Sequence, residues 1–155
     1  MTEKLFSLPI GCSLRRATAQ DIWSIRKLVL SAKLDPTQLR WPQFWVIECE
    51  GEVVACGQLR SFSRAQELGS LVVAKPWRDR GLGAFLTGHL IEQHTQPLYL
   101  ECLGEKLAQF YRSFGFVPVS WKKLPRSLKF KFGISQLAKV LFRLPVEIMQ
   151  YQGGK

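Results

Sequence analysis

Hydrophobic positions along the chain recur with two different periods, and each period predicts a type of element. Residues 68–73, Leu-Gly-Ser-Leu-Val-Val, form a short apolar run that is typical of a largely buried strand. Within residues 82–90, leucine and phenylalanine recur every three or four positions, which places them on one face of a helix. This stretch therefore predicts a buried strand followed closely by a helix.

The rest of the chain repeats these two patterns in alternation. Thr18 to Asp21 has the form of a helix N-cap, and apolar residues then recur at helical spacing from Ile22 to Val29. A third helix is predicted at 107–114, ending at Gly115. Further strands are predicted at residues 14–17, 44–48, 53–59, 97–102, 116–119 and 146–151. This order predicts a mixed α/β sheet, and without repeats or a linker we expect one domain over 1–155.

A basic, glycine-bearing turn joins the strand predicted at 68–73 to the helix that follows it. Its sequence is Arg-Asp-Arg-Gly-Leu-Gly-Ala at residues 78–84. The start of a helix presents backbone N–H groups without intrahelical partners, and the helix dipole places partial positive charge there. Glycines let the backbone approach a ligand closely, so a phosphate group fits such a turn. The spacing lacks the third glycine of the dinucleotide fingerprint and the Gly-Lys-Ser/Thr of the P-loop. An ordinary tight turn is the alternative for this segment taken alone.

Composition and cysteine usage narrow the class of protein. With 155 residues, 46% hydrophobic and 22% charged, the chain has the composition of a soluble globular domain. We find no apolar stretch of membrane-spanning length and no signal-peptide core, so we expect no transmembrane segment and a cytoplasmic location. The four cysteines lack C-x-x-C spacing, so we expect buried, reduced thiols rather than a zinc site or redox motif. They are Cys12, Cys49, Cys56 and Cys102.

The formal net charge of +10 favours an anionic partner, whether nucleic acid, anionic lipid, acidic protein or a polyanionic cofactor. A basic C-terminal segment, about 121–144, carries seven lysines and arginines and no acidic residue. A solvated surface is the plain explanation of such a segment. No nucleic-acid-binding motif accompanies it, so we do not expect a nucleic-acid partner.

Three motifs in the chain resemble those of the GNAT (GCN5-related N-acetyltransferase) superfamily, and they occur in the family's order. They are L-R-R-A-T-x-x-D at Leu14–Asp21, R-x-x-G-x-G at Arg78–Gly83 and F-Y-x-x-x-G-F at Phe110–Phe116. The resemblance covers residues 14–119. It implies a GNAT fold: a central mixed, mostly antiparallel sheet with a splayed pair of central strands, flanked by helices.

The resemblance also implies the activity and the cofactor. The chain would be an N-acetyltransferase that transfers an acetyl group from acetyl-CoA to a primary amine by direct attack, with no metal. The cofactor would lie where the strands at 68–73 and 98–102 splay apart, and a bulge in the first of them would free an N–H to polarise the thioester carbonyl. The expected acetyl-CoA contacts are Leu71, Val72 and Val73 along the pantetheine arm, and Arg78, Asp79, Arg80, Gly81, Leu82, Gly83 and Ala84 at the pyrophosphate.

Direct attack needs a neutral amine, and an amine with a pKa of roughly 10.4 must first lose a proton. Glu67 stands eleven positions before Arg78, which is the spacing of the base glutamate in the histone-acetyltransferase branch of the family. Glu101 on the partner strand is the second candidate. Tyr111 stands where the family places the general acid that protonates the departing thiolate. Structural alternatives are a surface ion pair for each carboxylate and a place in the core for Tyr111. Many members carry an asparagine seven residues before this tyrosine, and here that position is Gly104.

The acceptor amine is open at this stage. Trp41, Phe44 and Trp45 in and beside the loop at 33–44 would suit an arylalkylamine or an apolar peptide side chain, or they belong to the core. His89 and His94 have no neighbouring ligands in sequence and are expected on a helix surface rather than at a metal site. Two alternative functions remain: a non-catalytic acetyl-CoA-binding module, and a basic protein that binds nucleic acid or anionic surfaces through the C-terminal segment. The sequence leaves the oligomeric state open between monomer and homodimer.

Overall fold

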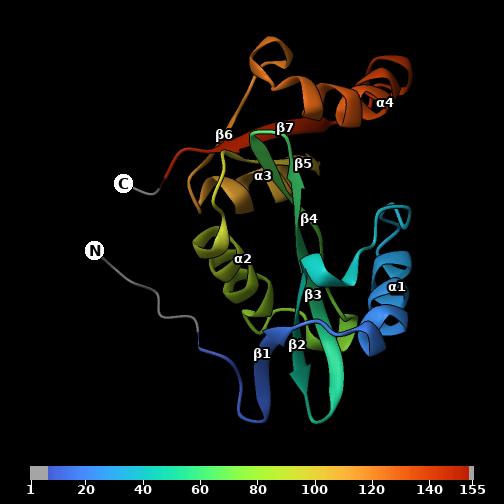
Figure 1. Cartoon of the computed structure of the whole chain (residues 1–155), viewed down its shortest axis with the longest axis vertical. Helices are drawn as coiled ribbons and strands as arrows, with labels where there is room; N and C mark the ends of the chain where they lie inside the picture. Colours follow the sequence, from blue (N-terminus) through green and yellow to red (C-terminus); the bar gives the residue numbers. More distant parts are fainter. Residues whose placement is uncertain (1–6, 154–155) are drawn as a thin grey trace. The chain divides into compact units, whose positions relative to one another are not determined.

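The computed structural model of this chain describes residues 7–153, apart from the side chains at positions 135 and 138 (Figure 1). Its strands are β1 (Cys12–Arg16), β2 (Phe44–Cys49), β3 (Glu52–Phe62), β4 (Ala65–Val73), β5 (Leu98–Leu103), β6 (Phe116–Pro118) and β7 (Val146–Tyr151). Its α-helices are α1 (Ile22–Ser31), α2 (Leu82–Gln93), α3 (Glu105–Arg112) and α4 (Arg126–Phe142). Single 3₁₀ turns lie at Ala19–Asp21, Trp41–Gln43, Lys75–Trp77 and Trp121–Lys123.

The strands form a sheet in the order β1-β2-β3-β4-β5-β7-β6. β1 with β2, β2 with β3, β5 with β7 and β6 with β7 are antiparallel, whereas β4 and β5 are parallel. The predicted mixed, mostly antiparallel sheet flanked by helices is therefore confirmed. Within the described residues, the ladder between β4 and β5 consists of Gln66 opposite Leu98 and Glu67 opposite Tyr99. So short a ladder is what a splayed pair of strands requires.

The chain divides into two compact units. The first consists of residues 1–59 and 68–93, and the second of residues 60–67 and 94–155. β3 and β4 each contribute residues to both units, so neither unit is a continuous piece of chain. The assignment of 1–155 to a single domain stays a prediction.

In the first unit, α1 and α2 cover opposite faces of the strands (Figure 1). On one face, Ile25 and Val29 of α1 pack in a buried cluster that includes Cys56 of β3. On the other face, a Cβ atom at Gly57 would lie 2.9 Å from the side chain of Leu90 in α2. Adjacent strand residues point to opposite faces, so Cys56 and Gly57 mark the two layers. The absence of a side chain at Gly57 lets α2 lie close to the sheet.

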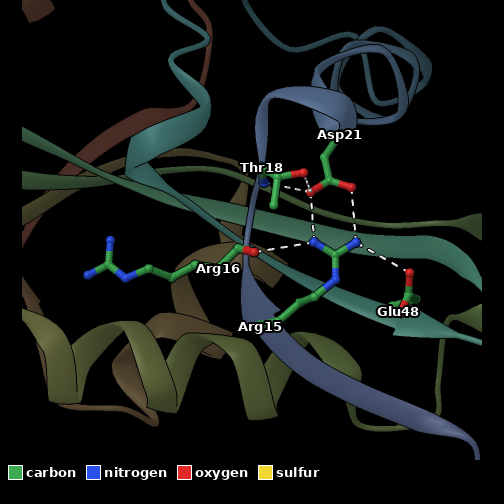
Figure 2. Close-up of polar contacts among 5 residues, drawn as sticks. All are labelled: Arg15, Arg16, Thr18, Asp21 and Glu48. Atoms are coloured by element: carbon green, nitrogen blue, oxygen red, sulfur yellow. Dashed lines mark hydrogen bonds and ion pairs between the residues drawn. The ribbon is translucent and has the colours of Figure 1, made fainter.

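Hydrogen bonds to the Asp21 carboxylate hold the junction between β1 and α1 together (Figure 2). Arg15 donates two hydrogen bonds to Asp21, Nη1 to Oδ2 at 2.7 Å and Nη2 to Oδ1 at 3.0 Å, and a third to Glu48 at 3.3 Å. The backbone N–H of Thr18 donates to the Asp21 carboxylate at 2.7 Å. These bonds, led by the one from Arg15, lower the pKa of Asp21 to about 2. The helix N-cap predicted at Thr18–Asp21 is confirmed.

The second unit contains a helix for which the sequence pattern predicted no element. α4 packs Leu128 and Phe132 into a buried cluster with Tyr99 of β5 and Ile148 of β7. The same helix exposes other apolar side chains, so its pattern is not that of a simple amphipathic helix. No helix within residues 7–153 combines the length and the apolar character needed to cross a bilayer.

The expectation of four reduced thiols is wrong for two of the cysteines. Cys12 of β1 lies directly opposite Cys49 of β2, and a disulfide joins them. Cys56 and Cys102 are free and buried. Burial raises the pKa of Cys56 to about 12 and that of Cys102 to about 11, so both remain protonated at neutral pH. The pairing was missed because it depends on the register of two strands, which cysteine spacing does not reveal.

Candidate functional site

The turn predicted to bind phosphate lies in the first unit, where β4 leads into α2. Residues 78–81 are exposed, whereas Leu82 is buried and anchors the start of the helix. Asp79 and Gly81 adopt positive φ angles of 63° and 81°. The first hydrogen bond of the helix runs from the N–H of Phe85 to the carbonyl of Gly81 at 3.0 Å. The preceding N–H groups therefore stand at the open end of α2, in the arrangement that binds anions in other proteins.

Two arginine side chains are held beside this turn. Arg78 donates through Nε to the carbonyl oxygen of Val73 at 3.1 Å, and Arg80 lies 4.7 Å from the ring centroid of Trp77. The first turn of α2 contains no acidic residue. A Cβ atom at Gly83 would lie 3.7 Å from Val73, which is an ordinary contact. The turn thus combines an open helix start with positive charge.

β4 is irregular where the bulge was predicted. Ser70, in the middle of the strand, has a φ angle of 51°, a left-handed conformation that interrupts an extended strand. Its neighbours on β3 hold it there: Gln58 donates to the Ser70 hydroxyl at 2.9 Å, and the thiol of Cys56 donates to its carbonyl at 3.5 Å. Beyond this point, Val72 joins the cluster under α1, whereas Leu71 lies beside α2.

Tyr111 belongs to the second unit, on α3. Its ring is buried and packs edge-to-face against Phe110 at 5.1 Å and Phe116 at 5.8 Å between centroids. Burial raises the pKa of the Tyr111 hydroxyl well above its ordinary value, and the nearby Cys102 adds to this. The phenol is therefore protonated at neutral pH, which is the form that a proton donor requires.

Glu67 lies at the end of β4 that pairs with β5, also in the second unit, and only 3% of it is exposed. Arg60 donates to Oε1 at 2.5 Å, and the ammonium of Lys131 lies 2.7 Å from Oε1 and 2.6 Å from Oε2. Both carboxylate oxygens thus face cations. The alternative of an ordinary surface pair does not describe this group. Lys131 was missed as a partner of Glu67 because it lies on a helix, α4, that the sequence pattern did not predict.

Glu101 lies on β5, two residues beyond Tyr99, which is the register partner of Glu67. Residues two apart on a strand share a face, and partners across a ladder share it too. The structure therefore brings Glu67 and Glu101 to the same face of two neighbouring strands. Tyr111 adjoins Cys102, whose side chain points to the other face of β5.

The aromatic residues proposed as an acceptor wall do not share one surface. Phe44 is fully buried in the cluster under α1. Trp45 points to the opposite face, where its ring packs against His89 of α2 at 4.2 Å and under the Arg16 guanidinium at 4.8 Å. His89 is half-buried on α2, and burial lowers its pKa below the ordinary value. Of these three aromatic residues, Trp41 is the exposed one.

A cavity of about 830 Å³ lies in the first unit, lined by α1, the turn between β2 and β3, and residues 74–78. Among the predicted cofactor residues, Arg78 lines it, whereas those at the start of α2 do not. In the part of the chain that is described, no group of three or more His, Cys, Asp or Glu side chains is placed to hold a metal ion.

Comparisons with known proteins define the family. The model of the acetyltransferase (GNAT) domain matches residues 40–118, just over half of the chain. The chain therefore belongs to the GNAT acetyltransferase family. A search of curated protein sequences found no match.

Solved structures of low sequence identity share the fold. N-acetylglutamate synthase from Neisseria gonorrhoeae, in complex with coenzyme A and N-acetyl-glutamate, aligns with a TM-score of 0.75 at 19% identity over 96% of this chain. The chain spans 37% of the length of that synthase. Rv2747 from Mycobacterium tuberculosis, in complex with CoA and NLQ, aligns with a TM-score of 0.68 at 20% identity over 90% of this chain and 98% of its own. Escherichia coli ElaA gives a TM-score of 0.65 at 16% identity, over 91% of this chain and 99% of its own.

Proposed function

We propose that this protein is an acetyl-CoA-dependent N-acetyltransferase that transfers the acetyl group to a primary amine by direct attack. Family membership supports an acyltransferase, and the coenzyme A in two of the structural neighbours supports the donor. The direct route needs no residue of the protein as a nucleophile. The protein then has to bind the cofactor, orient the thioester, accept the amine proton and supply a proton to the departing thiolate.

The observation that carries the proposal is the geometry of the turn at the start of α2. The backbone turns in left-handed conformations at Asp79 and Gly81, and the N–H groups that follow precede the first intrahelical bond. A pyrophosphate at this position would gain charge-assisted hydrogen bonds from these groups and from the helix dipole. Arg78 and Arg80 add positive charge at the rim. The main chain of 71–73 is the proposed partner of the pantetheine arm.

Proton transfer is assigned to residues of the second unit. Tyr111 holds its proton at neutral pH because it is buried, so we assign it the proton given to the thiolate of coenzyme A. Glu67 is the proposed acceptor of the amine proton, and its pairing with Arg60 and Lys131 sets a condition on this role. An incoming ammonium must take the place of one of these cations before it can pass a proton to the carboxylate. Glu101, on the same face of β5, is the second candidate and fits a relay through water.

The proposal is tested by consumption of the acetyl-CoA thioester in the presence of an acceptor panel. The panel contains small primary amines, peptides with free N-termini and lysine peptides, and free coenzyme A is measured against time. We expect release of coenzyme A that depends on one class of amine, and acetylated product of the matching mass. Tight binding of acetyl-CoA without acceptor-dependent turnover across the panel would identify a non-catalytic binding module instead.

A further inference from the structure

α4 is apolar on two opposite faces, and the fold of its own unit uses one of them. Leu128 and Phe132 are buried in the cluster with β5 and β7. Phe130, halfway between them in sequence, is 90% exposed. A helix turns about 100° per residue, so Phe130 points nearly opposite to the buried pair. The second apolar face is therefore a surface.

This face is a continuous stripe. Phe130, Ile134, Leu137 and Leu141 follow one another at intervals of four, three and four residues, which keeps them within a narrow sector of the helix. Their exposed fractions are 90%, 82%, 60% and 64%. Single exposed apolar residues are common on proteins, but a stripe along three turns of one helix marks an interaction site. We refer to these four residues as the apolar stripe.

The segment that carries the apolar stripe is strongly basic. Residues 121–144 contain seven lysines and arginines and no aspartate or glutamate. Lys131 pairs with Glu67. The other six lysines and arginines have no aspartate or glutamate within residues 121–144 to pair with. Five of these six are exposed: Lys122, Lys123, Arg126, Lys139 and Arg143. The surface therefore offers apolar area and positive charge together.

Charge decides which partner suits this surface. A second copy of the chain would bring one strongly positive segment against another, which opposes association. A nucleic acid would neutralise the lysines and arginines but would leave the apolar stripe in water. An anionic lipid bilayer satisfies both features, because apolar side chains enter the boundary between head groups and acyl chains while cationic side chains meet the head groups.

We propose that α4 docks the protein on an anionic membrane surface, with the apolar stripe inserted at the head-group boundary and exposed lysines and arginines of residues 121–144 on the lipid phosphates and carboxylates. The helix lies in the plane of the interface and does not cross it, as its length and charge require. None of the four residues of the apolar stripe is assigned a role in acetyl transfer, so the two functions can be tested with different variants.

The test is flotation of the full chain with vesicles of phosphatidylcholine containing about 30% phosphatidylserine, and with vesicles of phosphatidylcholine alone. We expect binding to the anionic vesicles, at least about tenfold weaker binding to the neutral ones, and loss of binding as salt is raised. Leu137→Glu should weaken binding at least about tenfold, and Arg126→Gln, at an exposed arginine on the same side of α4 as Leu137, about fivefold. Leu30→Glu is the matched control, because Leu30 is an equally exposed leucine on α1 and the charge change is the same.

Circular dichroism and acetyl-CoA turnover of Leu137→Glu check that the fold is intact, and Ile134→Glu repeats the test one turn earlier. Four results would overturn the proposal. They are equal binding of Leu137→Glu and the wild type, equal binding to neutral and anionic vesicles, tighter binding to duplex DNA than to vesicles, and a dimer in light scattering that Leu137→Glu dissociates. The last of these would make a second copy the occupant of the apolar stripe.

Discussion

Replacing Asp21 with asparagine should destabilise the protein at neutral pH and have little effect in acid. The pKa of Asp21 is lowered from 3.8 to about 2, chiefly by the hydrogen bond from Arg15. A shift of roughly 1.8 units corresponds to about 2.4 kcal/mol of folding free energy. One third of the Arg15 side chain is exposed, so water screens the pair, and we expect about 1–2 kcal/mol. Because the pKa is lower in the folded state, this stability is present above about pH 4 and is lost as the pH falls toward 2.

The assay is urea unfolding of wild type and Asp21→Asn at pH 7, 4 and 2.5, followed by circular dichroism. The difference in the free energy of unfolding should be about 1–2 kcal/mol at pH 7 and should shrink steadily toward pH 2.5. Glu92→Gln makes the same isosteric change at an exposed carboxylate on α2 and should leave stability within about 0.5 kcal/mol at every pH. A difference for Asp21→Asn that is constant from pH 7 to 2.5 would exclude the ion pair with Arg15 as its cause, because an uncharged contact would then account for it.

Three further predictions concern proton transfer and the disulfide. Tyr111→Phe deletes only the hydroxyl and should lower kcat roughly 100-fold with little change in acetyl-CoA affinity; unchanged kcat at saturation would remove its role as general acid. Glu67→Gln leaves Lys131 without its counter-ion and should lower the free energy of unfolding by about 3 kcal/mol, measured in urea. If Glu67 is also the base, kcat/KM of the folded variant should approach that of the wild type as the pH rises from about 6 to 10. Parallel pH profiles of the two proteins would make Glu67 a structural residue. Thiol titration of the denatured, unreduced protein should find two reactive thiols of four cysteines, because Cys12 and Cys49 are joined; four reactive thiols would contradict the pairing.

Local patterns predicted most of the fold, because each element was specified by its own residues. The strand expected at 68–73 is the second part of β4, and the helix expected from 82 begins at Leu82. The N-cap at Thr18–Asp21 could be predicted from the sequence because the two residues that form it are only three positions apart. The turn at the start of α2 forms as predicted for the same reason, while its ligand stays a prediction.

What could not be predicted depends on residues that meet only in the folded chain. α4 has apolar residues on opposite faces with basic residues between them, so no single helical period stands out. Lys131 on α4 then supplies a partner for Glu67 at a separation of 64 residues. The disulfide depends in the same way on the register that places Cys12 opposite Cys49. Phe44 and Trp45 do not form one aromatic surface for an acceptor, because neighbours on one strand point to opposite faces of the sheet.

The proposed acetyltransferase activity requires that the turn at the start of α2 binds the pyrophosphate of acetyl-CoA. This binding is tested most directly by calorimetric titration of acetyl-CoA into wild type, Gly83→Leu and Gly88→Leu. Both glycines lie on α2, and a Cβ atom at Gly88 would meet nothing within 4 Å, so the second variant is the matched control. We expect Gly83→Leu to weaken binding at least about 100-fold, because its side chain would stand where the backbone must approach the phosphates, and Gly88→Leu to bind as wild type does. Equal affinities of Gly83→Leu and Gly88→Leu would contradict the account.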